Sequence, residues 1–435
     1  MSAKAFDVVV AGGGPAGSTA ASLVAMQGHR VLLVEKEVFP RYQIGESLLP
    51  STVHGVCRML GVTDELADAD FPVKRGATFR WGGRPEPWSF SFEASPRLTG
   101  STAFAYQVDR TRFDEILLKN AKRKGVVVRE GCSVTAVAEE GDRVTALRYT
   151  DADGGEHEVG ARFVIDASGH GSPLFSSVGG TRDHEESSRG LALHGYFGNG
   201  CRRLPEPRSG DILNVAFDSG WFWYVPLLGG LTSVGVVVRE ERAEKARCDR
   251  EVTFKALIAE CPTISDLLSE GMRVTAGQYG ELRIREDYAY CQTTFWRPGM
   301  ILVGDAACAV APLFSSGVHL ATYSALLAAR SINSVLAGDL DEETALTEFE
   351  ARYRREFGAF SGLLTAFHTM TGDEYPEPES FVDLAAGVSS GEAALAACGG
   401  GTAAPAEPMF PGGLVVSPDG LKWLSHAPEE REAAR

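Results

Sequence analysis

Short, nearly uninterrupted apolar runs are the clearest pattern along the chain. Phe6–Ala11 and Val31–Val34 have the pattern of strands that are buried on both faces of a parallel sheet. The small-residue segment Ser18–Gln27 lies between them and predicts the helix of a βαβ unit. Three later runs have the same character: Val126–Arg129, Arg162–Ile165 and Met300–Val303. Because long insertions separate these runs, we expect a nucleotide-binding domain that is assembled from discontinuous segments.

A second pattern, in which aromatic and apolar residues alternate with polar ones, predicts an antiparallel sheet in a second domain. Five segments show it: Ala77–Trp81, Trp88–Phe92, Leu191–Phe197, Trp221–Pro226 and Ser233–Val238. From Ala321 to Thr371 the pattern is helical, and Asp339–Glu350 is most simply a solvated helix face. Gly399–Pro411 is rich in Pro, Gly and Ala, which predicts a partly irregular tail.

Composition and charge exclude several classes of protein. The net charge of −16 over 435 residues disfavours nucleic acid and anionic membranes as partners. No apolar run approaches the roughly 18 residues that a membrane span needs, and the N-terminal residues have no signal-peptide pattern. The eight cysteines are scattered, without a CxxC or Cys/His cluster, so we expect neither a metal site nor a disulfide framework. The expected location is the cytoplasm.

A glycine-rich loop joins the first apolar run to the first helix. Gly12, Gly14 and Gly17 have the GxGxxG spacing, which provides a tight turn, close backbone approach to a pyrophosphate and close packing of helix on strand. Glu35 ends the second apolar run, where its carboxylate can accept hydrogen bonds from a ribose diol. Together these features predict a dinucleotide site, with Ala16 among the loop residues that face the cofactor.

Two further turns favour FAD over NAD as the bound dinucleotide. Val164–Gly169 and Ile301–Ala307 each end a strand in a turn that contains Asp and Gly, and Asp305 can hold ribityl or ribose hydroxyls. The order and spacing of these segments resemble the flavoprotein monooxygenases with the para-hydroxybenzoate hydroxylase fold over most of residues 1–330.

That resemblance implies the fold class. It is α/β, with a Rossmann-like FAD-binding domain, an inserted antiparallel β-sheet substrate domain and a C-terminal helical region. The expected boundaries are 1–75, 105–177 and 280–335 for the FAD-binding domain, 76–104 and 178–279 for the substrate domain, and 336–435 for the C-terminal region with its partly irregular tail.

Two motifs narrow the family. Phe39–Pro50 (FPRYQIGESLLP) resembles a loop of flavin-dependent halogenases that occurs in altered form in geranylgeranyl reductases. Trp221–Pro226 (WFWYVP) is close to the WxWxIP motif of the halogenases, with valine in place of isoleucine. An aromatic strand of this kind also suits an ordinary core. If the chain is a halogenase, Trp221 and Trp223 form a wall between flavin and substrate that excludes water.

Lys74 matches the position of the essential lysine in that family, with Arg75 as the competing assignment. An isolated lysine is usually a solvated surface group, whereas a partly desolvated one has a lowered pKa and a reactive amine. The resemblance implies that Lys74 binds hypochlorous acid, or forms a chloramine, and delivers electrophilic chlorine to the substrate.

Pro312–Ala321 (PLFSSGVHLA) opens a helix whose first N–H groups can meet an anion or the flavin edge. By resemblance, the backbone amides of Ser316 and Gly317 hold chloride. Phe314 replaces the glutamate of tryptophan halogenases, which indicates the branch that acts on phenols and pyrroles. His319 is expected to pack or cap rather than catalyse. The remaining residues assigned to the cofactor are these: Arg41, Glu46, Ser47, Arg110, Pro312, Gly317 and Val318.

The implied reaction begins with reduced FAD and oxygen, which give the flavin C4a-hydroperoxide. Chloride then yields hypochlorous acid, which reaches Lys74. A separate flavin reductase supplies the reduced cofactor. The expected substrate is an electron-rich ring, free or attached to a carrier protein, in natural-product (antibiotic) biosynthesis. The alternatives are a single-component aromatic hydroxylase, a reductase of the geranylgeranyl type and a non-catalytic FAD-binding protein.

Overall fold

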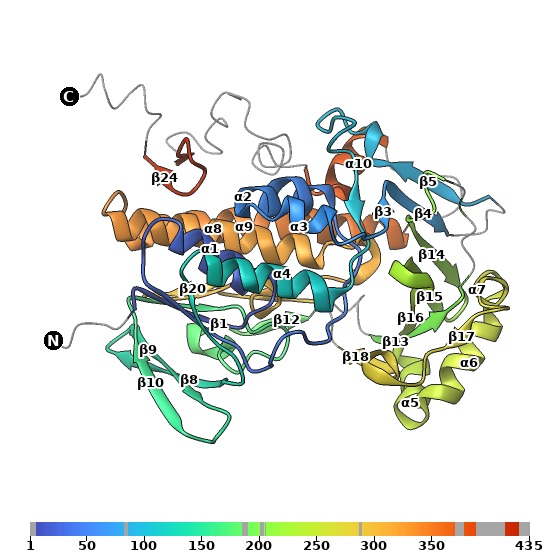
Figure 1. Cartoon of the computed structure of the whole chain (residues 1–435), viewed down its shortest axis with the longest axis horizontal. Helices are drawn as coiled ribbons and strands as arrows, with labels where there is room; N and C mark the ends of the chain where they lie inside the picture. The colour runs from blue at the N-terminus through green and yellow to red at the C-terminus, as the bar shows by residue number, and fades with distance from the viewer. Residues whose placement is uncertain are drawn as a thin grey trace.

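The architecture was taken from a computed structural model, which describes residues 6–81, 86–184, 190–200, 204, 206–286, 289–369, 378–388 and 414–425. Two sheets dominate it, one at each end of the molecule, and long helices run along its length (Figure 1). The segment Gly399–Pro411, for which an irregular tail was expected, lies outside the described residues.

The first sheet has six strands in the order β20-β21-β11-β1-β2-β7. Every pair is parallel except β20 with β21. The strands are β1 (Val8–Ala11), β2 (Val31–Val34), β7 (Val127–Arg129), β11 (Phe163–Asp166), β20 (Trp296–Arg297) and β21 (Met300–Leu302). All four residues of β1, of β2 and of β11 are buried, which explains why their sequences are runs rather than alternations. The five predicted strands of this sheet are therefore confirmed, within one or two residues at their ends.

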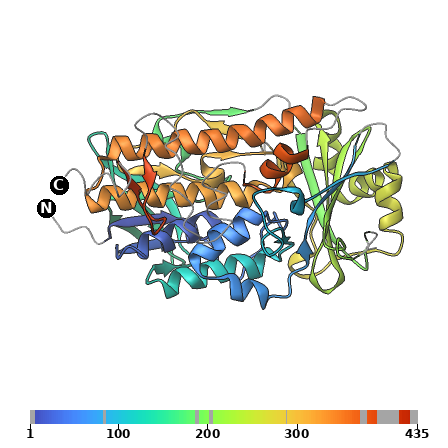
Figure 2. The same ribbon diagram turned by 90° about the horizontal axis from the view of Figure 1, so that it is seen from above.

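Helices cover this sheet and connect its strands. Helix α1 (Pro15–Ala25) packs against α4 (Arg110–Arg123) and α8 (Gly317–Ala337), and α8 packs against the long α9 (Glu342–Thr369). Figure 2 shows α8 and α9 side by side along the molecule. Helix α8 begins at Gly317, and Gly338, at φ +77°, ends it in the left-handed conformation that glycine adopts without strain.

The second sheet follows the order β17-β13-β16-β15-β14-β4-β5, with β18 paired to β13. Its strands are β4 (Gly76–Arg80), β5 (Trp88–Ser91), β13 (Gly190–Gly198), β14 (Ile212–Phe217), β15 (Gly220–Pro226), β16 (Leu231–Arg239), β17 (Met272–Arg273) and β18 (Arg283–Glu286). The sheet is antiparallel except where β14 runs parallel to β4. The alternating aromatic pattern correctly predicted its central strands.

Three helices cover one face of this sheet, which the strand-based prediction for this region had not included. They are α5 (Glu240–Cys248), α6 (Arg250–Glu260) and α7 (Pro262–Leu267). On β15, Phe222 and Tyr224 join the apolar cluster under these helices, whereas Trp221 and Trp223 join the main core on the opposite face. The alternation along β15 therefore turns both tryptophans toward the interior of the molecule.

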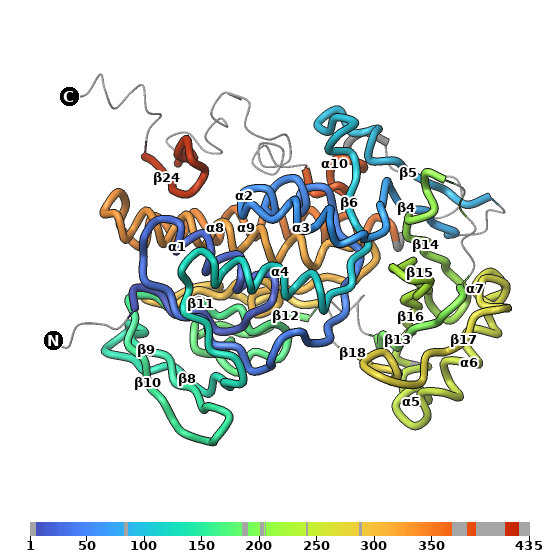
Figure 3. Tube along the Cα trace, in the orientation of Figure 1, coloured from blue at the N-terminus to red at the C-terminus, as the bar shows by residue number. Residues whose placement is uncertain are grey.

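Smaller elements complete the chain. The remaining strands are β3 (Val73–Lys74), β6 (Ala105–Tyr106), β8 (Ser133–Glu140), β9 (Arg143–Thr150), β10 (Glu156–Gly160), β12 (Arg182–His184), β19 (Tyr290–Gln292), β22 (Cys308–Ala309), β23 (Val415–Val416) and β24 (Trp423–Leu424). The remaining helices are the π-helical turn η1 (Ser51–Cys57), α2 (Arg58–Leu60), α3 (Thr63–Ala67), α10 (Pro378–Ala385) and the short 3₁₀ turns η2 (Phe92–Ala94), η3 (Phe175–Val178), η5 (Leu228–Gly230), η6 (Gly277–Tyr279), η7 (Gly304–Ala306) and η8 (Pro312–Phe314). Figure 3 shows α10, from the C-terminal part of the chain, next to β5 from its first quarter. Within the described segments, no helix combines the length and apolarity that crossing a membrane requires.

Candidate active site

The glycine loop between β1 and α1 contains two kinds of glycine. A Cβ on Gly12, which has φ +101°, would lie 2.5 Å from the Ala167 carbonyl oxygen, and a Cβ on Gly17 would overlap the Gly12 carbonyl oxygen. The absence of a Cβ at these two glycines therefore lets α1 pack closely against β1 and the turn after β11. Gly14 caps α1 without a side-chain hydrogen bond, and its added Cβ would meet only the Arg41 guanidinium, at 3.4 Å. The open side of Gly14 is therefore the side on which a phosphate fits.

Glu35 closes the other side of this loop from the end of β2. The side chain is buried, and the Gly13 N–H donates to Glu35 Oε2 at 2.5 Å while the Glu37 N–H donates to Oε1 at 2.9 Å. Each carboxylate oxygen keeps a further lone pair that can accept a ribose hydroxyl. Glu35 thus lies where the sequence predicted a ribose contact.

Two arginines form a cationic cradle opposite the start of α1. Asp114 is fully buried on α4 and accepts from Arg41 Nη1 at 2.6 Å and from Arg110 Nε at 2.7 Å. Arg110 also donates to the Ile44 carbonyl at 2.5 Å, which fixes the loop that carries Glu46. Among these three groups, one carboxylate is shared by two guanidiniums, so one positive charge is left over that a pyrophosphate could use.

The two aspartate-containing turns differ in what their carboxylates do. Asp305 remains partly exposed in η7, where Arg285 Nη2 lies 2.6 Å from its carboxylate and Tyr290 donates to its carbonyl at 2.5 Å. Asp166, in contrast, is fully buried and accepts from the hydroxyls of Ser168 and Ser172. Burial raises the pKa of Asp166. Asp305 is therefore available to a ligand, whereas Asp166 stabilises its own turn.

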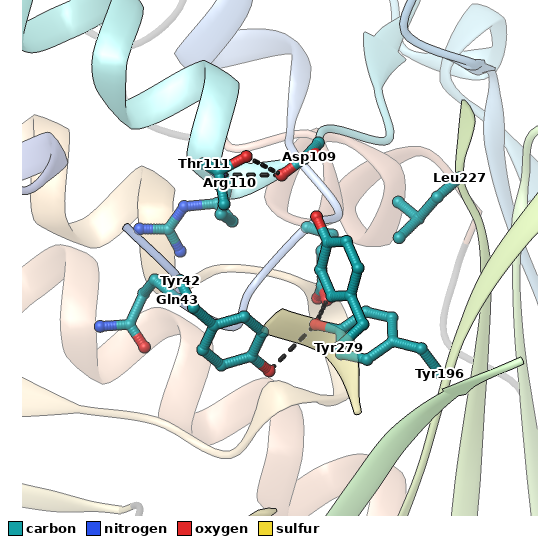
Figure 4. Close-up of a pocket in the computed structure, with 9 residues that line it drawn as sticks. Tyr42, Gln43, Asp109, Arg110, Thr111, Tyr196, Leu227 and Tyr279 are labelled. Carbon is teal, nitrogen blue, oxygen red and sulfur yellow. Dashed lines mark hydrogen bonds between the residues drawn. The ribbon is translucent and has the colours of Figure 1, made fainter. Parts of the chain in front are cut away.

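Tyr42, Tyr196 and Tyr279 lie close together in a pocket (Figure 4). Glu46, from the Gly45–Ser47 loop, also lines this pocket. The Tyr196 hydroxyl donates to Glu46 Oε1 at 2.6 Å and lies 3.0 Å from the Tyr42 hydroxyl. Burial raises the pKa of Glu46, and Ser47 Oγ is buried without a hydrogen-bond partner among the described residues. The pocket is lined by Tyr42, Gln43, Glu46, Asp109, Arg110, Thr111, Tyr196, Leu227 and Tyr279. These polar groups are the kind that would meet a cofactor's hydrogen-bonding edge.

Lys74 points into the protein from β3, whereas Arg75 is half-buried and lines a surface pocket. The Lys74 Nζ donates to the Leu48 carbonyl at 3.0 Å and lies 5.6 Å from the centre of the Phe92 ring. Burial lowers the pKa of Lys74 to about 7, partly offset by the Asp211 carboxylate. Lys74 therefore carries a neutral, nucleophilic amine much more readily near neutral pH than an exposed lysine does.

This burial has a consequence for stability. Between about pH 7 and the ordinary lysine pKa of 10.5, the unfolded chain holds a proton on Lys74 that the folded chain has lost. The free energy of unfolding should therefore rise with pH across this window, by at most about 1.4 kcal/mol per pH unit. Denaturant unfolding of the wild type and of Lys74→Met at about pH 7 and about pH 9 measures this rise. A stability difference between the two proteins that does not change with pH would contradict the lowered pKa.

Aromatic rings from distant segments pack together where α9 and α10 meet β4 and β5. Phe79 and Trp88, on β4 and β5, each lie next to Phe367 of α9, and Trp88 is 4.9 Å from Phe381 of α10. The Phe314 ring packs against both of these phenylalanines, with ring centres 5.4 Å apart for Phe367 and 5.7 Å apart for Phe381. We call this set the aromatic chamber: Phe79, Trp81, Trp88, Phe90, Phe314, Phe367 and Phe381. These rings pack on one another, and their apolar faces disfavour a charged group at this place.

Trp221 and Trp223 line the face of β15 that is turned to this interior. Trp221 lies 6.2 Å from Trp81, and the Trp223 indole donates to Ser233 Oγ at 3.3 Å. Gly235, opposite Trp223 on β16, makes room for the indole, because an added Cβ would overlap the ring. Gly235→Ala should therefore lower the free energy of unfolding by about 1–3 kcal/mol, measured by denaturant titration. A variant as stable as the wild type would show that the indole is not fixed there.

The start of α8 presents backbone amides without a side-chain cap. Ser315 is left-handed at φ +60°, Ser316 is buried, and an added Cβ on Gly317 would meet nothing within 4 Å. Pro312 and Val318 flank these residues in η8 and α8. The first N–H groups of a helix attract anions, so this terminus suits a halide or the flavin edge.

His319 is part of the packing around that terminus, as its sequence context suggested. It is buried, with Ser51 Oγ 2.8 Å from Nδ1 and Glu356 Oε1 2.8 Å from Nε2. The three residues tie η1, α8 and α9 together. Within the described segments, no group of His, Cys, Asp and Glu has the arrangement of a metal site.

Several residues of the site carried no signal that sequence reasoning could use. Asp114, Phe367 and Phe381 are ordinary residues of amphipathic helices in the sequence, and only the fold brings them to the cradle and the chamber. Gly235 could have been noticed as a glycine inside a strand pattern, which often marks a close approach.

Comparison with known proteins places this arrangement in a family. The model of the tryptophan halogenase family matches residues 7–101 and 93–375. A tryptophan 2-halogenase of Chondromyces crocatus is 34% identical over 365 residues, which are 83% of this chain and 67% of that protein. The myxobacterial chondrochloren halogenase CndH, a variant of the FAD-dependent halogenases, is 50% identical, with a TM-score of 0.84 over 96% of this chain and 99% of that one. The flavin-dependent halogenase CmlS is 32% identical, with a TM-score of 0.77 over 86% of this chain and 67% of that one. The chain therefore belongs to the FAD-dependent halogenase family.

Proposed function

We propose that this enzyme chlorinates an electron-rich aromatic ring, a phenol or a pyrrole, and that Lys74 delivers the oxidised halogen. The observation that carries the proposal is the position of Lys74: a buried amine with a pKa of about 7, held between the Leu48 carbonyl and the Phe92 ring. A surface lysine would be almost entirely protonated near neutral pH, so only a small share of it could react as a nucleophile with a hypohalous acid.

The residues around the glycine loop fit FAD. Gly14 leaves space beside Arg41, Glu35 has free lone pairs, and Ser47 Oγ is a buried polar atom without a partner among the described residues. In this proposal Arg41 and Arg110 neutralise the pyrophosphate, and Asp305 accepts hydrogen bonds from ribityl or ribose hydroxyls. Gly12, Ala16 and Gly17 shape the loop, while Glu46, Pro312, Gly317 and Val318 border the ring system. Bound reduced flavin supplies the electrons for oxygen activation.

Chloride is proposed to bind at the start of α8, on the backbone amides of Ser316 and Gly317. The absence of a side-chain cap supports this placement, because the amides keep their capacity for an anion. Trp221 and Trp223 then stand as a hydrophobic wall that keeps the aromatic substrate from the cofactor. Such a wall lets only a small neutral oxidant reach Lys74.

The aromatic chamber supports a flat, uncharged ring as the substrate. Phe314 contributes a ring to the chamber, so a carboxylate does not stand at this position. A phenol or pyrrole ring is electron-rich because of its own oxygen or nitrogen, so it reacts with electrophilic chlorine without further activation. It can arrive free or attached to a carrier protein, in the assembly of a natural product. A separate flavin reductase is the proposed source of reduced cofactor.

The proposed function is tested by product analysis. The purified enzyme is mixed with FAD, a flavin reductase, NADH, oxygen and chloride, and with phenol and pyrrole acids that are free or carrier-loaded. A product in which chlorine replaces hydrogen, and which requires chloride, is expected. A product that gains oxygen whether or not halide is present would instead establish an aromatic hydroxylase.

A further inference from the structure

A pair of cysteines faces each other just after the Gly304–Asp305 turn. Strand β19 pairs with β22, and Cys291 stands directly opposite Cys308. Neither residue belongs to the cofactor cradle or to the aromatic chamber. The sequence offered no hint of the pair, because the two cysteines are 17 positions apart and not part of a CxxC motif.

The register of the two strands brings the thiols together. The Gln292 N–H donates to the Ala307 carbonyl at 2.9 Å, which makes the adjoining pair, Cys291 and Cys308, a non-hydrogen-bonded one. In such pairs the Cα atoms are about 4.5 Å apart and the side chains are close, within the range that a disulfide spans. The Cys308 side chain is near enough to Cys291 to lower the pKa of the Cys291 thiol.

The two thiols differ in their surroundings. Arg354 Nη1 lies 3.5 Å from Cys291 Sγ, and the same guanidinium is fixed by the carbonyls of Gln292 and Thr293 at 3.0 and 2.8 Å. The neighbouring Cys308 side chain, together with the charge of Arg354, lowers the pKa of Cys291, against burial and the Asp183 carboxylate on β12. Cys308 is fully buried, and burial raises its pKa. Cys291 is therefore the more readily ionised of the two thiols, and Cys308 lies directly opposite it.

We propose that Cys291 and Cys308 form an oxidation site at which a peroxide closes a cross-strand disulfide. Cys291 loses its proton and its thiolate attacks one peroxide oxygen; the O–O bond breaks, Cys291 becomes a sulfenic acid, and the second oxygen leaves as hydroxide that takes up the released proton as water. Cys308 then attacks the Cys291 sulfur, the S–O bond breaks, and the Cys308 proton leaves with the hydroxide as water. Two thiols and one hydrogen peroxide thus give one disulfide and two waters. The bond fastens the strand that follows Asp305 to β19.

The proposal is tested on the FAD-loaded protein with hydrogen peroxide as the probe. The intact mass should fall by two hydrogen atoms and recover with dithiothreitol. Trypsin does not cut between Arg297 and Pro298, so cleavage at Met300 with cyanogen bromide is needed to separate the two cysteines. The fragments that carry Cys291 and Cys308 should then be joined before reduction only.

Variants separate the two roles. Cys308→Ser should stop at a sulfenic acid on Cys291, trapped by dimedone, and Cys291→Ser should leave Cys308 unreacted over the same time. Arg354→Gln should slow the first step about threefold for each unit by which the Cys291 pKa rises. Cys132→Ser, on a distant strand end, serves as the matched control and should behave like the wild type. No loss of hydrogen in the wild type, or a disulfide to any other cysteine, would overturn the proposal, and this test needs no variant to fold.

Discussion

Lys74→Met is expected to abolish chlorination while the reduced cofactor continues to consume oxygen. Methionine has a length similar to that of lysine and no charge, so it can fill the same buried space between Leu48 and Phe92. What disappears is the one group that the proposal assigns to delivery of the halogen. Loss of a preorganised catalytic group costs about 100-fold to 1,000-fold in rate, and we expect at least that loss of chlorinated product.

Oxygen uptake and product mass are measured on the same samples. The matched control is Arg75→Met, because Arg75 is the next residue but lies at the surface pocket. That control should retain most of the wild-type rate. Chlorinated product from Lys74→Met at a rate near that of the wild type would remove Lys74 from the mechanism, whatever the control shows.

Alanine substitutions at two glycines of the first loop are expected to have different effects, one on stability and one on FAD binding. Gly17→Ala should destabilise the whole fold, by about 3 kcal/mol or more, because the new methyl group overlaps the Gly12 carbonyl oxygen. Gly14→Ala should fold normally, because its backbone is extended and the nearest atom to the added Cβ, Arg41 Nη2, lies at an ordinary contact distance of 3.4 Å. It should nevertheless bind FAD about tenfold more weakly or worse, because the methyl group occupies the path of the pyrophosphate.

Thermal unfolding without cofactor and flavin-fluorescence titration distinguish the two effects. Gly358→Ala is the control, since Gly358 lies in α9 with nothing within 4 Å of its added Cβ, and alanine favours a helix. A Gly14→Ala protein that binds FAD like the wild type would place the pyrophosphate elsewhere.

The parts of the fold that follow from local chemistry were predictable. β1, β2 and β11 are buried on both faces, so their sequences are apolar runs, and the glycine spacing before α1 has a steric cause at Gly12 and Gly17. The alternation along β15 also predicted a strand. The sequence did not show which face of β15 is turned to the interior of the molecule. In the structure, α5–α7 cover the face of Phe222 and Tyr224, so Trp221 and Trp223 face inward.

The parts that depend on distant packing were not predictable. Asp114 looks like any acidic residue four positions after an arginine, yet it holds both Arg110 and Arg41. Phe367 and Phe381 reach the aromatic chamber because α9 and α10 return to β4 and β5. A single sequence carries no record of such contacts, since each residue satisfies its own helix equally well without them.

In the proposed function, each oxygen molecule that the reduced cofactor consumes leads to one halogen transfer through Lys74. The most direct measurement is the amount of chlorinated product formed per oxygen consumed, in a single turnover with and without chloride. We expect a ratio of chlorinated product to oxygen consumed that is close to one with chloride, and no modified product without chloride. A ring that gains oxygen in both cases, in proportion to the oxygen consumed, would contradict the account.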